Sequence, residues 1–304
     1  MLMEYEADHH TGMQVNEISG WIYDYTSGYP FLVSRLCQLI DEDIVSDERS
    51  RTDSLGWSKE GFQEAVRMLL AEKNTLFESL SEKVASYPDL RDMLQTLLFS
   101  GKSITYNYYE PAINIATVFG LVRNEKGTVA VSNRIFETWL YNLFLSSADM
   151  QKKYIYEVSL RDKNQFIVNG QLDMKKILER FVYHFQEIYG DQKEQFLEEE
   201  GRKYFLLYLR PIINGTGNYY IESRTRNMSC TDVIVDYLGE QYIIEMKIWY
   251  GEEYRSRGER QLAGYLDDYH KSKGYMLSFN FNKNKEIGVH EMVIDGKTII
   301  EAVV

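Results

Sequence analysis

Two extended runs, Thr231-Asp-Val-Ile-Val-Asp-Tyr237 and Gln241-Tyr-Ile-Ile-Glu-Met-Lys-Ile-Trp249, follow each other closely in the second half of the chain. The second run is almost wholly apolar or aromatic except for Glu245 and Lys247, as expected of a strand buried on both faces. Side chains two residues apart on a strand share a face. The pattern therefore predicts a carboxylate and an amine side by side on one face of a sheet.

A hairpin between the two runs would add a second carboxylate. If Gly239-Glu240 is the two-residue turn, Leu238 pairs with Gln241, and Asp232 lies opposite Lys247 and diagonal to Glu245. Two carboxylates near one hard cation predict a site for Mg²⁺ or Mn²⁺, and a neighbouring lysine can orient water or stabilise charge on a phosphate. The alternative is a salt bridge among three exposed side chains, worth less than about 1 kcal/mol.

The segments around these runs predict the architecture of residues 165–304. Two amphipathic helices are expected between Met174 and Leu209, a further strand at Tyr219 to Thr225, a helix at Arg260 to Tyr269 and a last strand at Gly274 to Phe281. The order helix, three strands, helix, strand predicts an α/β mixed sheet flanked by helices.

The first half of the chain is expected to be mainly helical. Residues 1–85 contain amphipathic runs such as Tyr29 to Ile40 and Phe62 to Leu70. Residues 86–150 follow the order helix, helix, hairpin, helix, with the hairpin at Leu121 to Val131, and this order resembles a winged-helix domain. Polar residues from Met150 to Gln165 predict a linker. The expected fold class is multidomain α+β.

Composition limits the functions that this chain can have. The 304 residues carry 34 basic and 46 acidic side chains, a net charge of −12, so a nucleic-acid site would have to be a local basic patch. Cys37 and Cys230 lack the spacing of a zinc site and favour a reducing, cytoplasmic compartment. No apolar run is long enough for a membrane span, and Met1 to Gln14 does not follow the pattern of a signal peptide.

The stretch Ser27-Gly-Tyr-Pro-Phe-Leu-Val-Ser-Arg-Leu-Cys37, with the winged-helix pattern after it, resembles the lid and C-terminal helical parts of prokaryotic AAA-like P-loop ATPases. The resemblance covers about the first 150 residues and includes no catalytic motif. Gly101-Lys102-Ser103 completes no Walker A loop, because Thr96 stands where the first glycine is needed. The resemblance implies an ATPase core preceding residue 1.

The two extended runs resemble the PD-(D/E)XK nuclease superfamily, especially the nuclease-like domain found behind AAA-like ATPase domains. Asp232 matches the metal-binding Asp of that family, and Glu245-Met-Lys247 matches its ExK motif. Gln261-Leu-Ala-Gly-Tyr265 matches the Gln-x-x-x-Tyr of the next helix. Glu200, with Glu198 and Glu199 as rivals, matches the acidic residue of the first helix. The resemblance implies a restriction-endonuclease-like fold, with Asp232, Glu245, Lys247 and Gln261 catalytic and Asp232, Glu245 and Glu200 binding the metal.

Substrate contacts are expected from the residues around this motif. Tyr265, Arg226, Arg257 and Arg260 are the predicted DNA-binding residues, within a basic group that also includes Arg224, Arg255 and Lys271. An ordinary solvated surface is the alternative. Relatives carry Gly-Arg before the metal-binding Asp, where this chain has Ser229-Cys230-Thr231.

These expectations support a Mg²⁺-dependent nuclease-like protein that acts on or binds DNA. The departure at Ser229-Cys230 keeps open a second interpretation, a catalytically inactive interaction or regulatory module of an AAA-like ATPase. A winged-helix transcriptional regulator is a third.

Overall fold

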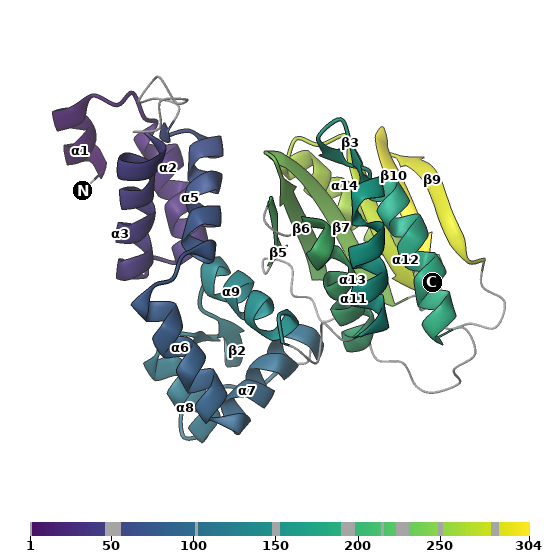
Figure 1. Ribbon diagram of the computed structural model, residues 1–304, viewed down its shortest axis with the longest axis horizontal. Coiled ribbons are helices and arrows are strands. Elements are labelled where there is room, and N and C mark those ends of the chain that lie inside the picture. Colours follow the sequence, from purple (N-terminus) through teal and green to yellow (C-terminus); the bar gives the residue numbers. More distant parts are fainter. Residues whose placement is uncertain are drawn as a thin grey trace. The chain divides into compact units, whose positions relative to one another are not determined.

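The computed structural model describes residues 2–45, 56–100, 103–147, 153–189, 198–213, 216–222, 231–248, 252–280 and 286–304. Helices and strands are mixed along the chain, as predicted (Figure 1). The chain divides into two compact units. Unit 1 consists of Met1–Met93 and Thr105–Tyr141, and unit 2 consists of Leu94–Ile104 and Asn142–Val304. None of the described helices is long and apolar enough to cross a membrane.

Unit 1 is helical apart from one short hairpin. Its elements are α1 (Leu2–His9), α2 (Val15–Thr26), α3 (Pro30–Gln38), the π-helical turn η1 (Leu39–Ile44), α5 (Lys59–Ala71), α6 (Thr75–Ser86), α7 (Pro88–Gln95), α8 (Pro111–Val118), β1 (Val122–Glu125), β2 (Thr128–Val131) and α9 (Arg134–Leu145). Side-chain caps fix several starts: Ser58 accepts a hydrogen bond from Gly61 N–H, and Asn74 accepts one from Phe77 N–H. The last turns of α7 and α9 cross into unit 2.

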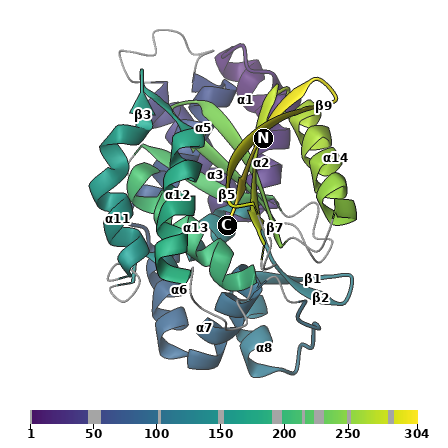
Figure 2. The ribbon, with the colours of Figure 1, turned by 90° about the vertical axis from the view of Figure 1, so that its right-hand side faces the viewer.

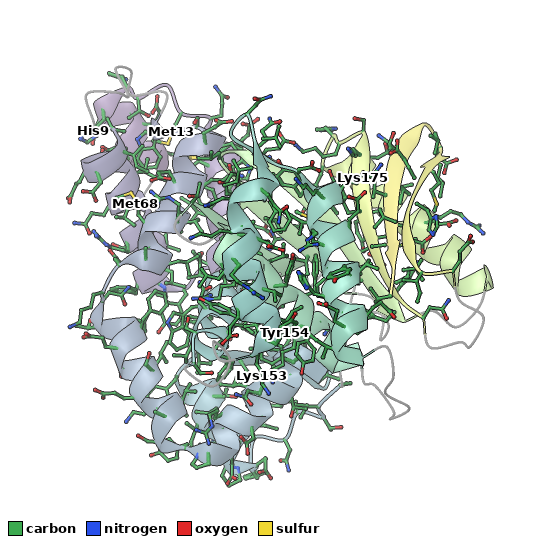
Figure 3. All side chains as sticks on the ribbon, turned by 45° about the vertical axis from the view of Figure 1, so that its right-hand side comes forward. His9, Met13, Met68, Lys153, Tyr154 and Lys175 are labelled. Atoms are coloured by element: carbon green, nitrogen blue, oxygen red, sulfur yellow. The ribbon has the colours of Figure 1, made fainter. Side chains whose placement is uncertain are left out.

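The apolar runs predicted at Tyr29 to Ile40 and Phe62 to Leu70 lie in the core of unit 1. Leu32 and Leu36 on α3 are fully buried, and Phe77 stacks on Trp139 with ring centroids 5.4 Å apart. Met13, in the segment after α1, is also buried (Figure 3). The amphipathic periodicity of the sequence was therefore a sound guide to the core of this half.

The β1–β2 hairpin confirms the hairpin predicted at Leu121 to Val131. Glu125 pairs with Thr128, so the turn is Lys126-Gly127, and both residues have the positive φ of a type I′ turn. Thr105 forms a bridge to Thr128 and extends this small sheet by one residue. α9 is capped by Asn133, whose side chain accepts a hydrogen bond from Phe136 N–H.

Unit 2 is a mixed sheet with helices on both faces. Its remaining elements are the π-helical turn η2 (Thr96–Ser100), α11 (Tyr154–Asp162), the 3₁₀ turn η3 (Lys163–Phe166), β3 (Ile167–Val168), β4 (Gln171–Leu172), α12 (Met174–Tyr189), α13 (Glu198–Ile213), β5 (Gly217–Glu222), β6 (Thr231–Tyr237), β7 (Glu240–Ile248), α14 (Glu252–Asp268), β8 (Lys273–Phe279), β9 (Gly288–Ile294) and β10 (Lys297–Val303).

The main sheet has six strands in the order β5-β6-β7-β8-β10-β9. β5, β6 and β7 are antiparallel neighbours, β8 runs parallel to both β7 and β10, and β9 pairs antiparallel with β10. The predicted order of helix, three strands, helix and strand is present from α13 to β8. The mixed sheet flanked by helices is therefore confirmed.

Two helical layers cover the sheet. Figure 2 shows α12 and α13 on one side of the sheet and α14 on the other. On the α14 side, Leu262 and Leu266 pack with Ile243, Met276 and Ile299, which come from β7, β8 and β10. On the opposite side, Phe185 of α12 contacts Phe279 of β8, with ring centroids 5.7 Å apart. The central strands β7 and β8 are therefore buried on both faces, as the apolar second run predicted.

Three features differ from the sequence-based expectations. Tyr154–Asp162, expected to be linker, form helix α11, because Ile155 and Val158 are buried and the Ser159 hydroxyl donates to the Tyr208 carbonyl on α13. Leu94–Ile104 belong to unit 2, whereas a single winged-helix domain was expected at 86–150. Strands β9 and β10 follow β8, where the sequence analysis placed no element.

Candidate active site

The hairpin of β6 and β7 brings the two predicted carboxylate positions together. Asp232 pairs directly with Glu245, and Tyr237 pairs with Glu240. The turn is Leu238-Gly239, with φ of 49° and 83°, and not Gly239-Glu240 as predicted. A type I′ turn needs two positive φ values and takes glycine readily at its second central position, which explains the difference. The predicted pairing of Asp232 with Lys247 was therefore wrong by two residues.

A register shift of two residues leaves every side chain on its predicted face. Residues 232, 245 and 247 consequently still share one face of the sheet. Direct pairing separates the backbones of Asp232 and Glu245 by about 5 Å, closer than the 7–8 Å of a diagonal pair. The side chain of Asp232 lies outside the described residues, so its position is known from the strand register alone.

Glu245 and Lys247 are buried on the α14 side of the sheet. Glu245 is 0% exposed and Lys247 is 2% exposed. They lie on the same face as Ile243, which packs against Leu262 and Leu266 of α14. The alternative of a salt bridge among exposed side chains therefore does not apply to these two residues. Burying charged groups costs several kcal/mol each unless they are paired and hydrogen-bonded, so this pair is not an incidental surface feature.

Helix α14 lies directly over Lys247. A Cβ added at Gly258 would lie 1.5 Å from Nζ of Lys247 and 2.7 Å from its Cε. The end of the lysine side chain thus occupies the space that any side chain at position 258 would need. Gly258 was not among the predicted site residues, because nothing in the local sequence pattern reveals which residue covers Lys247.

Two further buried polar residues lie on this face. Ser278 is the β8 neighbour of Lys247, and its hydroxyl donates to Oε1 of Glu301 at 2.7 Å. Glu301 on β10 is 1% exposed and lies in the same cross-sheet row as Glu245, because both residues pair with Met276. Glu301 was not predicted as a site residue, because no strand was expected after residue 281. The available signal was the β-prone apolar run Ile299 to Val303, which one acidic residue interrupts.

The other predicted site residues are only partly placed. Gln261 and Tyr265 are on α14, as predicted, and Tyr265 is half-buried, whereas the Gln261 side chain is outside the described residues. Arg260 is exposed on α14. Glu200 lies in the first turn of α13, and its side chain and that of Arg257 are not described; Arg226 lies wholly outside the described ranges.

Lys271 does not belong with the predicted basic group at the site. Its Nζ lies 2.6 Å from Oε1 of Glu240, at the start of β7. Glu240 and Lys247 are seven positions apart on a strand, or about 23 Å. Lys271 instead lines a separate polar pocket of about 360 Å³ with Tyr242 and Tyr275.

The α14 side of the sheet offers one type of ligand that a hard divalent cation prefers, carboxylate oxygen. Glu245 supplies a buried carboxylate, and the register places Asp232 beside it. Among the side chains that the structure describes, no group of three or more His, Cys, Asp and Glu is arranged to hold a metal ion. Asp232 and Glu200, two of the three predicted ligands, are not among those side chains.

A second polar cluster joins α11 to α12. Asp162 accepts hydrogen bonds from Arg180 at 2.8 Å and from His184 at 3.2 Å, and His184 also contacts Glu187 at 3.0 Å. Partial burial raises the pKa of Asp162, but the hydrogen bonds from Arg180 and His184 outweigh it and leave the pKa below its usual value. Tyr154, labelled in Figure 3, donates to Glu187. The cluster lies in the helical layer on the side of the sheet away from α14, so it is separate from the candidate active site.

No protein-family model, curated protein or solved structure matches this chain.

Proposed function

We propose that unit 2 is a PD-(D/E)XK nuclease-like domain with a restriction-endonuclease-like fold, and that it cleaves DNA with Mg²⁺ or Mn²⁺. One observation carries the proposal: Asp232 is paired with Glu245, and Lys247 lies on the same face, inside a sheet built in the predicted order of helix, three strands, helix and strand. A buried carboxylate and a buried lysine on one face of a sheet, with a second acidic residue at the paired position, are difficult to explain by stability alone.

Each residue then has a defined task. Asp232 and Glu245 would hold the cation, with Glu200 as a third ligand. The bound ion lowers the pKa of a water molecule and neutralises charge on the phosphate. Lys247 orients the attacking water or stabilises the negative charge that builds up during the reaction. Gln261 assists the catalytic group, and Tyr265, Arg226, Arg257 and Arg260 contact the DNA.

A plasmid-nicking and single-strand cleavage assay with Mg²⁺ or Mn²⁺ tests this proposal. The parent protein should cleave, and Glu245→Gln and Lys247→Met should not. Glu291→Gln and Lys273→Met make the same chemical changes at exposed positions of the same sheet and should cleave like the parent. Absence of metal-dependent cleavage by the parent protein would contradict the proposal.

A second candidate function is a non-catalytic module that docks onto an AAA-like ATPase core. The observation that favours it is the burial of Glu245 and Lys247, since a phosphate cannot reach groups that are 0% and 2% exposed unless α14 shifts. Calorimetric titration with Mn²⁺ separates the two functions. Binding that Glu245→Gln abolishes supports the nuclease, and absence of binding supports the docking module.

Unit 1 has a supporting part in both proposals. Its helices and β1–β2 hairpin are consistent with the lid-like and winged-helix parts of an AAA-like ATPase. The low cysteine content favours a cytoplasmic location. A gel shift with the whole chain and DNA, compared with a chain that lacks unit 1, would show whether unit 1 binds DNA.

A further inference from the structure

Helix α14 contains two glycines with very different surroundings. Gly264 is exposed, and a Cβ added there would meet no atom within 4 Å. Gly258 is buried against Lys247, with Nζ, Cε and Cδ of the lysine all within 3.0 Å of the position of such a Cβ. Glycine weakens a helix relative to alanine, so glycine inside a helix usually has a local reason. At position 258 the reason is the lysine.

The contact involves only the far end of the lysine side chain. No backbone atom of β7 is among the three nearest atoms at Gly258. A methyl group at this position would therefore displace the ammonium and leave the strand in place. The carboxylate of Glu245, on the same strand, would stay where it is.

The position of the ammonium matters for the reaction that the site would perform. Lys247 is held between the sheet below and Gly258 above, with Ser278 beside it on β8. A group that stabilises a transition state has to be fixed before the reaction begins, and a misplacement of about 1 Å can cost a factor of about 100 in rate.

We infer that Gly258 is a positioning residue for Lys247: its missing side chain leaves the space that fixes the lysine ammonium on the α14 side of the sheet, on the same face as Glu245. The expected effect of Gly258 on the reaction rate rests on the proposed nuclease function. Its expected effect on the position of Lys247 rests on the contact alone. Gly258 itself touches neither metal nor substrate.

The kinetic test compares Gly258→Ala with Gly264→Ala, the same change in the same helix. Gly258→Ala should lower kcat about 10- to 100-fold, while KM and the Mn²⁺ affinity change less than about twofold, because the carboxylate ligands do not move. Gly264→Ala should cleave like the parent. A Gly258→Ala variant with the kcat of the parent would overturn the inference.

A double-mutant cycle tests the contact without any activity. The unfolding equilibrium constants of the parent, Gly258→Ala, Lys247→Ala and the double variant should show a coupling of about fivefold or more, because the methyl group is tolerated once the lysine is shortened. Additive effects would overturn the inference. If the parent protein cleaves no DNA, the proposed function is wrong, and the cycle still decides whether Gly258 fixes Lys247.

Discussion

Asp232 lies directly opposite Glu245 in the antiparallel ladder of β6 and β7. The pairing depends on a turn at Leu238-Gly239, one position before the predicted turn, and this moves the partner of Asp232 by two residues, from Lys247 to Glu245. Because the side-chain period of a strand is two, the difference changed the partners but not the faces. A slip of one residue would have sent Asp232 to the α12 side and left Glu245 without a second carboxylate.

Replacing the two central residues of the site should have different consequences. Glu245→Gln removes the negative charge of the proposed metal ligand and should abolish both Mn²⁺ binding and cleavage. Lys247→Met keeps the carboxylates and should retain Mn²⁺ binding while cleavage falls by a factor of about 100 or more. Calorimetry and the plasmid assay measure the two properties separately. Loss of metal binding in Lys247→Met would show that the lysine supports the ligands and not the chemistry.

Substitutions at the two central positions of the Leu238-Gly239 turn should change the free energy of unfolding in opposite directions. Leu238 is 67% exposed with φ of 49°, a conformation that asparagine adopts more easily than leucine. Leu238→Asn should raise the free energy of unfolding by about 0.5–1 kcal/mol, and Gly239→Ala should lower it by about 1 kcal/mol. Urea denaturation measures both. Equal stabilities of the two variants would mean that the turn differs from the one described.

Acid should weaken unit 2 through Asp162. Its pKa is lower in the folded protein than the ordinary value of 3.8, so the unfolded chain binds more protons than the folded chain in the pH range between the two pKa values. The stability from its bonds to Arg180 and His184 is therefore fully present above about pH 4 and is lost as the pH falls through the folded pKa. Asp162→Asn should flatten the dependence of the free energy of unfolding on pH between pH 5 and pH 2.5, as measured by urea denaturation at each pH. Asp89→Asn, at an exposed position in unit 1, is the control and should leave this dependence unchanged.

The hydroxyl of Tyr208 should be dispensable. Tyr208 is fully buried on α13, and within the described part of the chain its hydroxyl has no hydrogen-bond partner. A buried donor without a partner costs about 1–3 kcal/mol, so Tyr208→Phe should raise the free energy of unfolding by about 1 kcal/mol. The Ser159 hydroxyl, in contrast, donates a hydrogen bond to the Tyr208 carbonyl. Ser159→Ala should therefore lower the free energy of unfolding by about 1 kcal/mol. A destabilised Tyr208→Phe would reveal a partner for the hydroxyl.

The sequence was informative wherever a pattern is local. The buried strand at Gln241 to Ile248 and the shared face of Glu245 and Lys247 followed from period-two alternation. The helices α12 and α13 followed from their apolar periodicity, although α13 continues through Pro211 to Ile213. These elements needed no knowledge of what packs against them.

The features that the sequence did not reveal are non-local. Glu301 lies close to the site only because β10 pairs parallel to β8. The sequence that connects two parallel strands does not reveal that they are neighbours in the sheet. Gly258 is significant only because α14 crosses above Lys247. Helix α11 was mistaken for a linker because its buried side, Ile155 and Val158, is short and lies among polar residues.

The contact between Gly258 and Lys247 also means that the residues at these two positions should vary together among homologous chains. Homologous chains with a lysine at the position of Lys247 should have a glycine at the position of Gly258, since nothing larger fits against the ammonium. Homologous chains with a short residue in place of the lysine do not have this constraint. At the position of Gly258 they should more often have alanine or serine, which favour the helix. Loss of the glycine in α14 would then identify, from sequence alone, the homologous chains in which the lysine no longer has its proposed role.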